Sequence, residues 1–365
     1  MSIIKSWLRK EWPLLLSYGS LIATLTFASH LFANPQGTAQ IALTFSWLFV
    51  VILLAAFAVV HHAECLAQKL GEPYGTLILT LSVIGLEVIM IATVMLTKNE
   101  NPLMARDTMF GVLMIVLNGL FGIAILAGAW RHKLQKFNVQ SSDTYLGGIV
   151  LLVGIGLVLP RLVSSESKFT FEIYLGVVCL LLYGVFLWVQ TKEHRGFFVY
   201  KNAEGEIVEE DHYESDHGIA YHVVLLILTL IPVVILAKQL SVVMYVGLSV
   251  LKLPDSLAGL AVALLILAPE GLAAIKAGLN NNLQRALNIC LGSALATIGL
   301  TIPVVLIIAE IVNQDIILGL DREEILLIAL SIILLKINLD KGETNVLKGL
   351  MHLIIFASYV VFIFL

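Results

Sequence analysis

Two stretches of the chain place a single carboxylate inside a long apolar run. The only charged residue in TLSVIGLEVIMIATVML is Glu87, and the only one in AVALLILAPEGL is Glu270. A charge in the middle of a bilayer costs about 2.5–3.5 kcal/mol on insertion scales, so a chain that needed only packing would use leucine there. Paired carboxylates can bind a cation, or protons when the cation is absent. We therefore expect Glu87 and Glu270 to form a site for cations and protons, which would be the metal-binding site of the chain.

The residues beside each glutamate predict a local break in its helix. Gly85 stands two residues before Glu87, and Pro269 and Gly271 flank Glu270. A loosened helix at membrane depth exposes backbone carbonyls that can bind a cation. Side chains that could add oxygen ligands are Thr80, Ser82, Asn118, Asn288 and Ser293. Spacing does not choose among them, and for the two asparagines hydrogen bonding between helices is an equal alternative.

The composition predicts the environment in which these carboxylates must work. Of 365 residues, 59% are hydrophobic and 13% are charged, with a mean hydropathy of +0.95. Soluble domains are about 45–50% apolar and about 25% charged. Many apolar runs reach the roughly 20 residues that cross a bilayer as a helix. The fold class is therefore an all-α polytopic membrane protein in contact with the lipid bilayer.

Charge and cysteine content exclude two other classes. The net charge of −4 and the lack of a basic patch exclude a nucleic-acid partner. The three cysteines are far apart and form neither a disulfide framework nor a CxxC metal motif.

The apolar runs predict about eleven transmembrane helices. They cover about 14–33, 39–60, 75–97, 108–130, 145–163, 169–190, 219–237, 257–279, 286–311, 324–339 and 345–365. The first run is long enough to be a retained span rather than a signal peptide. Residues 238–256 either lengthen the seventh span or form an interfacial helix. The distribution of Lys and Arg places the N-terminus in the cytoplasm and the C-terminus outside, in the cell (inner) membrane.

A weak internal repeat divides the chain. Glu87 follows Gly75 by twelve residues and Glu270 follows Gly259 by eleven, at matching depths in spans that run in opposite directions. We expect an N-terminal helix (1–38), a five-helix repeat (39–190), an acidic cytoplasmic linker (191–218) and a second, inverted five-helix repeat (219–365). Inverted repeats are typical of secondary transporters that bind substrate near the membrane midplane. The linker is either a solvated segment or a cation sensor.

Several of these stretches resemble a known family. AECLAQKLGEPYG with LSVIGLEV, and LAPEGLAAIKAGLNNNLQRALNICLGSALATIGLTIP in the second half, are similar to the calcium/cation antiporter superfamily, specifically its cation/proton exchanger branch. The resemblance extends from about residue 39 to the end. It implies an eleven-helix fold with two inverted repeats. It also implies export of Ca²⁺, with Na⁺ or K⁺ as further substrates, in exchange for H⁺ at Glu87 and Glu270 without a cofactor. It also implies that Glu64 gates the site or relays protons.

One departure from the family pattern concerns selectivity. Many members carry Gly-Asn four and three residues before each glutamate, whereas this chain has Val83-Ile84 and Ile266-Leu267. The missing amide oxygens leave open whether Ca²⁺ or a monovalent cation is preferred, so a Na⁺ or K⁺/H⁺ antiporter with little Ca²⁺ transport is the first alternative.

Other classes of function use other residues. An intramembrane metallohydrolase would use His61, His62 and Glu64, although HHAEC lacks the HExxH spacing of zinc hydrolases. A membrane scaffold would carry no proton flux. For the two glutamates, the structural alternative is an ion pair with Lys276, a residue better placed to extend its amine to the membrane surface. We expect a secondary transporter of inorganic cations and protons rather than an enzyme, and a homo-oligomer is compatible with the sequence.

Overall fold

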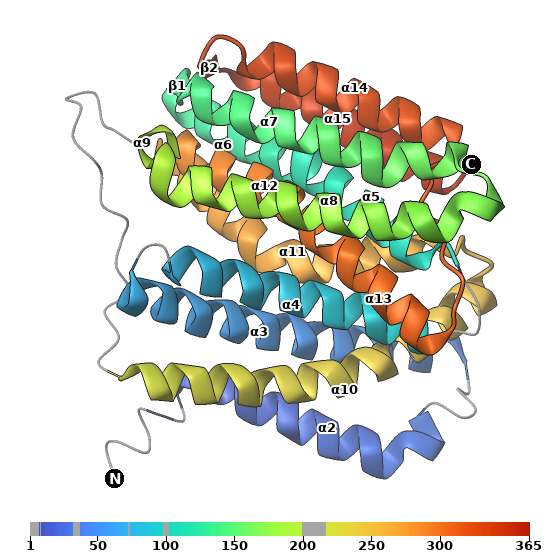
Figure 1. Ribbon diagram of the computed structural model, residues 1–365. Helices are drawn as coiled ribbons and strands as arrows, with labels where there is room; N and C mark the ends of the chain where they lie inside the picture. The colour runs from blue at the N-terminus through green and yellow to red at the C-terminus, as the bar shows by residue number, and fades with distance from the viewer. Residues whose placement is uncertain (1–6, 8, 32–36, 72–73, 98–101, 199–216) are drawn as a thin grey trace. The chain divides into compact units, whose positions relative to one another are not determined.

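The computed structural model describes residues 7, 9–31, 37–71, 74–97, 102–198 and 217–365 (Figure 1). Most of this part of the chain is helical, and β1 (Gln135–Lys136) pairs antiparallel with β2 (Glu343–Thr344). Among the described residues, eight helical segments are long and apolar enough to cross a membrane, and Trp12–Thr26 and Ile78–Thr93 are shorter apolar stretches. The predicted helical class with several candidate spans is therefore confirmed, and the count of eleven spans stays a prediction. Most of the acidic linker lies outside the described residues.

The helices are separated at the predicted loops, and some are interrupted by short π or 3-10 segments labelled η. Their bounds are α2 (Trp12–Leu31), α3 (Thr38–Leu70), α4 (Tyr74–Thr97), α5 (Met104–Met114), η1 (Ile115–Leu120), α6 (Phe121–His132), α7 (Val139–Val153), η2 (Gly154–Val158), η3 (Leu159–Leu162), η4 (Ser165–Ser167), α8 (Lys168–Trp188), η5 (Val189–Glu193), α9 (Arg195–Phe198), α10 (Ile219–Leu251), α11 (Ser256–Leu279), α12 (Leu283–Ala296), η6 (Thr297–Thr301), α13 (Ile302–Val312), α14 (Arg322–Leu339) and α15 (Val346–Ile363).

Two helices are longer than their predicted spans. Helix α10 has 33 residues, so residues 238–251 lengthen the seventh span and do not form a separate interfacial helix. Helix α3 also has 33 residues because buried positions such as Ala63 and Leu66 continue its helical spacing beyond residue 60. It ends at Gly71, whose φ of 64° suits glycine.

Two compact units divide the helices. Unit 1 comprises Met1–Asn101 and His212–Ile266, and unit 2 comprises Pro102–Asp211 and Leu267–Leu365. The boundary falls inside α11, between the two halves of that helix. These units group helices by packing and do not follow the predicted repeat boundaries, so the inverted repeat stays a prediction.

In unit 1, the long helices α3 and α10 pack along each other, and α2 and α4 each pack against both of them (Figure 1). Pro232 lies inside α10 and has no N–H, so the carbonyl of Leu228 lacks its helical donor. The hydroxyl of Tyr18 in α2 donates to that carbonyl at 3.0 Å. Because of Pro232, a carbonyl oxygen of α10 is thus available to accept the hydrogen bond from α2.

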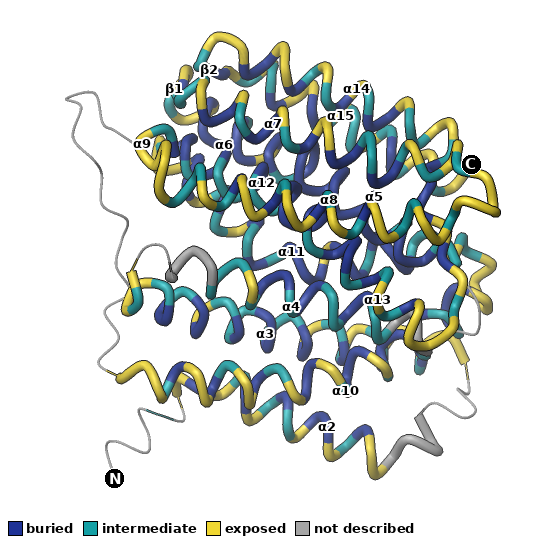
Figure 2. The backbone as a smooth tube through the Cα atoms, viewed as in Figure 1, coloured by how far each residue is buried: buried dark blue, intermediate teal, exposed yellow. Residues whose placement is uncertain are grey.

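The centre of unit 2 is the helix formed by α5, η1 and α6. Every residue from Met104 to Gly119 except Asp107 is buried, as the dark colour of α5 indicates (Figure 2). A helix that is apolar on all sides belongs in the interior of a bundle. Helix α15 packs against it closely, and a Cβ added to Gly349 would lie 2.8 Å from the amide nitrogen of Leu126.

The outer helices of unit 2 expose apolar surface. Helix α8 buries Leu175, Cys179, Tyr183 and Phe186, which form one stripe along the helix. Its other faces expose large side chains that include Ile173, Leu181 and Trp188. A helix that buries one stripe and remains apolar elsewhere is suited to hydrocarbon rather than water.

The loops of unit 2 gather at two ends. At one end, the backbone N–H of Asn138 donates to Gln284 at 2.7 Å, and β1 pairs with β2. At the other end, the N–H of Ile317 donates to Pro102 at 2.9 Å and that of Leu320 donates to Leu157 at 2.8 Å. Successive loops of unit 2 therefore lie at alternate ends, as the predicted alternation of spans requires. The side of the membrane that each end faces stays a prediction.

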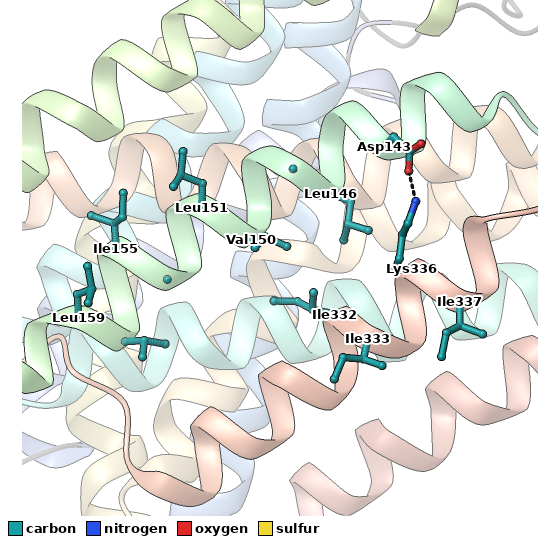
Figure 3. Close-up of a pocket in the computed structure, with 13 residues that line it drawn as sticks. Asp143, Leu146, Val150, Leu151, Ile155, Leu159, Ile332, Ile333, Lys336 and Ile337 are labelled. Atoms are coloured by element: carbon teal, nitrogen blue, oxygen red, sulfur yellow. Dashed lines mark hydrogen bonds and ion pairs between the residues drawn. The ribbon is translucent and has the colours of Figure 1, made fainter.

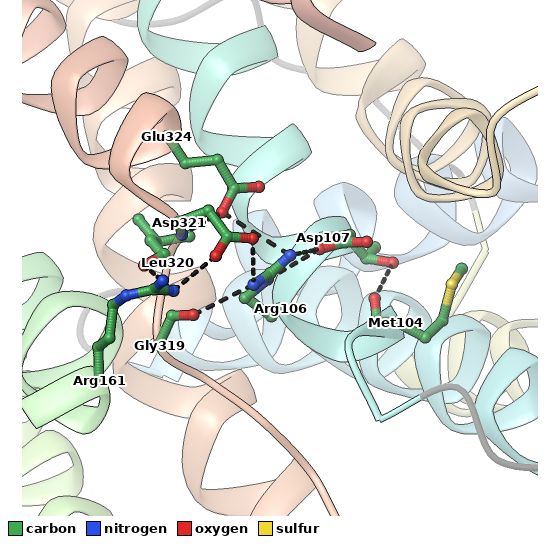
Figure 4. A network of polar contacts seen from close by, with 9 residues as sticks. Met104, Arg106, Asp107, Arg161, Gly319, Leu320, Asp321 and Glu324 are labelled. Atoms are coloured by element: carbon green, nitrogen blue, oxygen red, sulfur yellow. Dashed lines mark hydrogen bonds and ion pairs between the residues drawn. The ribbon is translucent and has the colours of Figure 1, made fainter. Parts of the chain in front are cut away.

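A buried arginine holds the second of these ends together (Figure 4). Arg106, whose side chain is 6% exposed, contacts Asp107 at 2.8 Å, Asp321 at 3.1 Å and Glu324 at 3.8 Å. It also donates to the carbonyl of Gly319 at 3.2 Å. Asp321 and Glu324 form the capping box of α14, so one guanidinium connects α5 to the start of α14.

Candidate cation site

Glu87 lies in the middle of α4 and is 1% exposed. Helix α4 is unbroken from Tyr74 to Thr97, so the predicted break at Gly85 is wrong. Thr80 is seven residues before Glu87 and therefore on the same helical face, about 10 Å away along the axis. Ser82 is five residues before Glu87 and is rotated from it by about 140°. Of these two predicted ligands, Thr80 is the one on the face of Glu87.

Glu270 lies on α11 and is half-buried. The hydroxyl of Ser293, on α12, donates to the Oε2 atom of Glu270 at 2.7 Å. Of the predicted oxygen ligands, Ser293 is the one that a described contact joins to Glu270. A hydroxyl beside a carboxylate can share in binding a hard cation, because both supply oxygen.

Helix α11 is unbroken from Ser256 to Leu279, so the predicted break at Pro269 and Gly271 is also wrong. Packing explains the glycine: a Cβ added to Gly271 would lie 2.6 Å from a methyl carbon of Leu120 in η1. Pro269 still removes one helical donor, and the carbonyl of Leu265, four residues earlier, loses its partner. A backbone oxygen is therefore released without a break in the helix.

Asn118 lies in η1 within a buried polar cluster of unit 2. Its amide donates to the hydroxyl of Ser331 at 2.8 Å, and its carbonyl oxygen is 3.2 Å from Nδ1 of His352. These contacts join η1 to α14 and α15. Asn118 therefore makes the hydrogen bonds between helices that were the alternative to a ligand role. Asn288 likewise donates to the carbonyl of Phe198 at 2.6 Å and accepts from Gln284 at 2.9 Å. A ligand role for either asparagine stays a prediction.

Asn118→Ala is expected to lower the free energy of unfolding by about 1–3 kcal/mol, because Ser331 and His352 would keep buried polar atoms without their partner. Thermal unfolding in detergent measures this loss. Thr144→Ala is the control, since that hydroxyl donates to the carbonyl of its own helix on an exposed face. A stable Asn118→Ala protein with altered cation affinity would instead favour a ligand role.

The histidines of HHAEC lie inside α3, in unit 1. His62 uses both ring nitrogens: Nδ1 is 3.1 Å from Nδ1 of His222, and Nε2 is 3.3 Å from Glu11. Its partners therefore lie on opposite sides of the ring and do not converge on one point. The described residues contain no group of three or more His, Cys, Asp or Glu that could hold a metal ion. Glu64 lies on the same helix, half-buried, two residues after His62.

A groove of about 870 Å³ lies elsewhere in unit 2, between α7 and α14 (Figure 3). It is lined by Leu, Ile and Val side chains, and an ion pair of Lys336 with Asp143, 2.7 Å apart, closes one end. An apolar groove of this kind does not offer the oxygen atoms that a cation requires.

The two central carboxylates belong to different units. Glu87 lies in unit 1 and Glu270 lies in the part of α11 that belongs to unit 2. Lys276 is exposed in the last turn of α11, two turns beyond Glu270. Each unit thus supplies one carboxylate in the middle of an apolar helix, and their pairing stays a prediction.

Known proteins share both the sequence and the fold of this chain. The model of the family described as sodium/calcium exchanger protein matches residues 40–192 and 221–365. The sodium-potassium/proton antiporter ChaA of Escherichia coli (strain K12) is 40% identical over 316 residues, which cover 86% of each chain. The putative ionic transporter y4hA of Sinorhizobium fredii (strain NBRC 101917 / NGR234) is 37% identical over 347 residues, 94% of this chain and 92% of that protein.

The crystal structure of the selenium-substituted Ca²⁺/H⁺ antiporter protein YfkE has the same fold. It superposes with a TM-score of 0.74 at 15% identity and covers 96% of this chain and 99% of its own. The family resemblance seen in the sequence is therefore confirmed, and so is a multi-pass membrane exchanger as the class of protein. The chain belongs to the sodium/calcium exchanger protein family.

Proposed function

We propose that the chain is a secondary active antiporter of the inner membrane that exports cations in exchange for protons through Glu87 and Glu270. The observation that carries the proposal is the position of each carboxylate inside an apolar helix: Glu87 is 1% exposed on α4, and Glu270 is half-buried on α11. Neither helix has another acidic residue. Intramembrane acids of this kind are functional by default, because their insertion costs free energy that packing does not require.

Competition for the same oxygens couples the two fluxes in this proposal. A bound cation cancels the charge of the carboxylates, and protons cancel it when the cation has left. An empty site with two charges would be costly to carry through a medium of low dielectric constant. The site therefore crosses the membrane with either cation or protons, and exchange becomes obligatory.

The residues before each glutamate favour monovalent cations over Ca²⁺. Ca²⁺ requires about six to eight oxygen ligands, and Val83, Ile84, Ile266 and Leu267 supply none from their side chains. The Escherichia coli relative, named a sodium-potassium/proton antiporter, points the same way. Export of Na⁺ or K⁺, with Ca²⁺ as a further substrate, is the form of the proposal that these residues support.

Proton flux in everted membrane vesicles tests the proposal directly. A pH-sensitive dye should report proton release from the vesicle lumen when Na⁺, K⁺ or Ca²⁺ is added, each titrated separately across pH. Vesicles without the protein are the control. An absence of cation-dependent proton flux with all three cations, in membranes shown to contain the folded protein, would contradict the proposal and favour a scaffold.

Ser293→Ala is expected to weaken apparent cation affinity roughly tenfold while transport continues. A hydrogen bond to a charged group contributes about 1.5–3 kcal/mol, part of which the cation regains by binding water in place of the hydroxyl. The half-saturating cation concentration in the dye assay measures the effect. Ser293→Thr keeps the hydroxyl and should restore affinity, and a Ser293→Ala protein with unchanged affinity would exclude the hydroxyl from the site.

A further inference from the structure

Unit 1 contains a buried chain of titratable groups that the proposed exchange does not use. Glu11, just before α2, is 6% exposed, His62 on α3 is 1% exposed and His222 on α10 is 2% exposed. The Nε2 atom of His62 is 3.3 Å from Glu11, and its Nδ1 atom is 3.1 Å from Nδ1 of His222. Tyr221 donates its hydroxyl to the other oxygen of Glu11 at 2.7 Å. Three helices therefore meet at one hydrogen-bonded line, which we name the histidine relay (Glu11, His62 and His222).

The geometry determines where the protons lie in this line. An ionised glutamate only accepts hydrogen bonds, so Nε2 of His62 carries the hydrogen that faces Glu11. When His62 is neutral, its Nδ1 is an acceptor and must receive the hydrogen of His222 Nδ1. The neutral relay thus donates in one direction, from His222 through His62 to Glu11.

A proton added to the relay reverses one of these bonds. If it binds Nε2 of His222, the N–H bond at Nδ1 of His222 breaks and a new N–H bond forms at Nδ1 of His62. His222 is left neutral with its hydrogen on Nε2, and the positive charge rests on His62 beside the carboxylate of Glu11. The relay therefore takes up one proton without leaving an uncompensated charge in the interior.

The surroundings favour this charge arrangement. Burial opposes ionisation of Glu11, but hydrogen bonds from His62 and Tyr221 and the attraction of His62 outweigh it, so the pKa of Glu11 lies below its usual value. Glu11 is then a carboxylate throughout the range in which histidines titrate. The other charged or titratable groups near the relay are Lys10, His61, Glu64, Cys65, Lys69 and His217, and α4 carries Glu87 as its one charged residue.

We propose that the histidine relay is a proton-binding site separate from Glu87 and Glu270, and that protonation of the relay slows transport. The proton gives His62 a positive charge, so its bond to the carboxylate of Glu11 becomes an ion pair and its bond to His222 becomes charge-assisted, and charge-assisted bonds are roughly twice as strong as neutral ones. The start of α2 is then held more firmly to α3 and α10, the two long helices of unit 1. Because alternating access requires one bundle of helices to move, a stiffer junction lowers the rate. This inference rests on the proposed antiport function.

The pH profile of transport tests the regulatory step. In proteoliposomes at saturating cation, the acid limb of His62→Gln and of Glu11→Gln should shift to lower pH by roughly half a unit or more. In His62→Gln the glutamine takes up no proton, and in Glu11→Gln the charge of a protonated His62 loses its compensating carboxylate. His194→Gln is the control, because this exposed histidine belongs to unit 2 and lies outside the relay, and its profile should equal that of the wild type. Acid limbs of both relay variants that coincide with the wild type would overturn the proposal.

Solid-state NMR of full-length protein with nitrogen-15 histidine tests proton binding without transport. Between about pH 5 and about pH 9, two histidines should change their ring-nitrogen shifts together, and His62→Gln should remove both changes. If His62→Gln does not fold, Glu11→Gln should separate the two titrations. Histidines of the wild type that titrate independently would overturn the relay, whereas a wild-type protein with no proton flux would overturn the antiport proposal alone.

Discussion

Glu87→Gln and Glu270→Gln are each expected to lower cation-dependent proton flux by at least about 100-fold. Glutamine keeps the size of the side chain but cannot ionise, so it neither balances the charge of a cation nor carries a proton. The loss of one carboxylate from a site of low dielectric constant removes several kcal/mol of attraction, and about 2.8 kcal/mol already corresponds to a factor of 100. Dye-monitored flux in everted vesicles measures the result.

A control separates this effect from a general loss of charge. Glu310 is exposed near the end of α13, so Glu310→Gln should transport normally. Both site variants should also unfold at or above the wild-type temperature, because a neutral amide is less costly to bury than a carboxylate. Normal transport by either site variant would exclude that glutamate, and normal transport by both would refute the paired site.

Much of the fold follows from local patterns. Apolar runs of about 20 residues predict spanning helices because the bilayer satisfies no backbone hydrogen bonds. The helix ends follow from capping chemistry: the side chains of Asn138, Asn282 and Asn345 each accept a backbone N–H at the start of α7, α12 and α15. The family resemblance then predicts Glu87 and Glu270 as the functional carboxylates.

Long-range partners could not be predicted in the same way. His62 and His222 are 160 positions apart, and Arg106 and Asp321 are 215 apart, so no local spacing connects them. The predicted breaks at Gly85, Pro269 and Gly271 fail for a related reason. Glycine beside a carboxylate suggests a break, yet Gly271 lets α11 approach Leu120 closely, and that need appears only when the neighbouring helix is in place.

Because Arg106 has partly buried acidic partners, we expect its removal to lower the free energy of unfolding by a large amount. In Arg106→Ala, Asp107 and Glu324, whose side chains are 13% and 20% exposed, would lose their cation. Removal of one partner from a buried ion network costs about 3–5 kcal/mol. Arg161→Ala is the matched control: Arg161 pairs with the same Asp321, but its side chain is 43% exposed, so it should cost less than about 1 kcal/mol. Unfolding in detergent measures both.

The pH dependence of the same variants identifies the electrostatic part of this loss. Burial raises the pKa of Asp321, but the hydrogen bonds and attraction of Arg161 and Arg106 outweigh it, so the pKa lies below its usual value. A lowered pKa in the folded state means that Asp321 stabilises the protein above about pH 4 and loses this contribution as the pH falls through the folded value. The stability gap between wild type and Arg106→Ala should therefore narrow on acidification below about pH 4. A constant gap would show that Arg106 acts through packing, and equal losses in Arg106→Ala and Arg161→Ala would show that burial does not distinguish the two arginines.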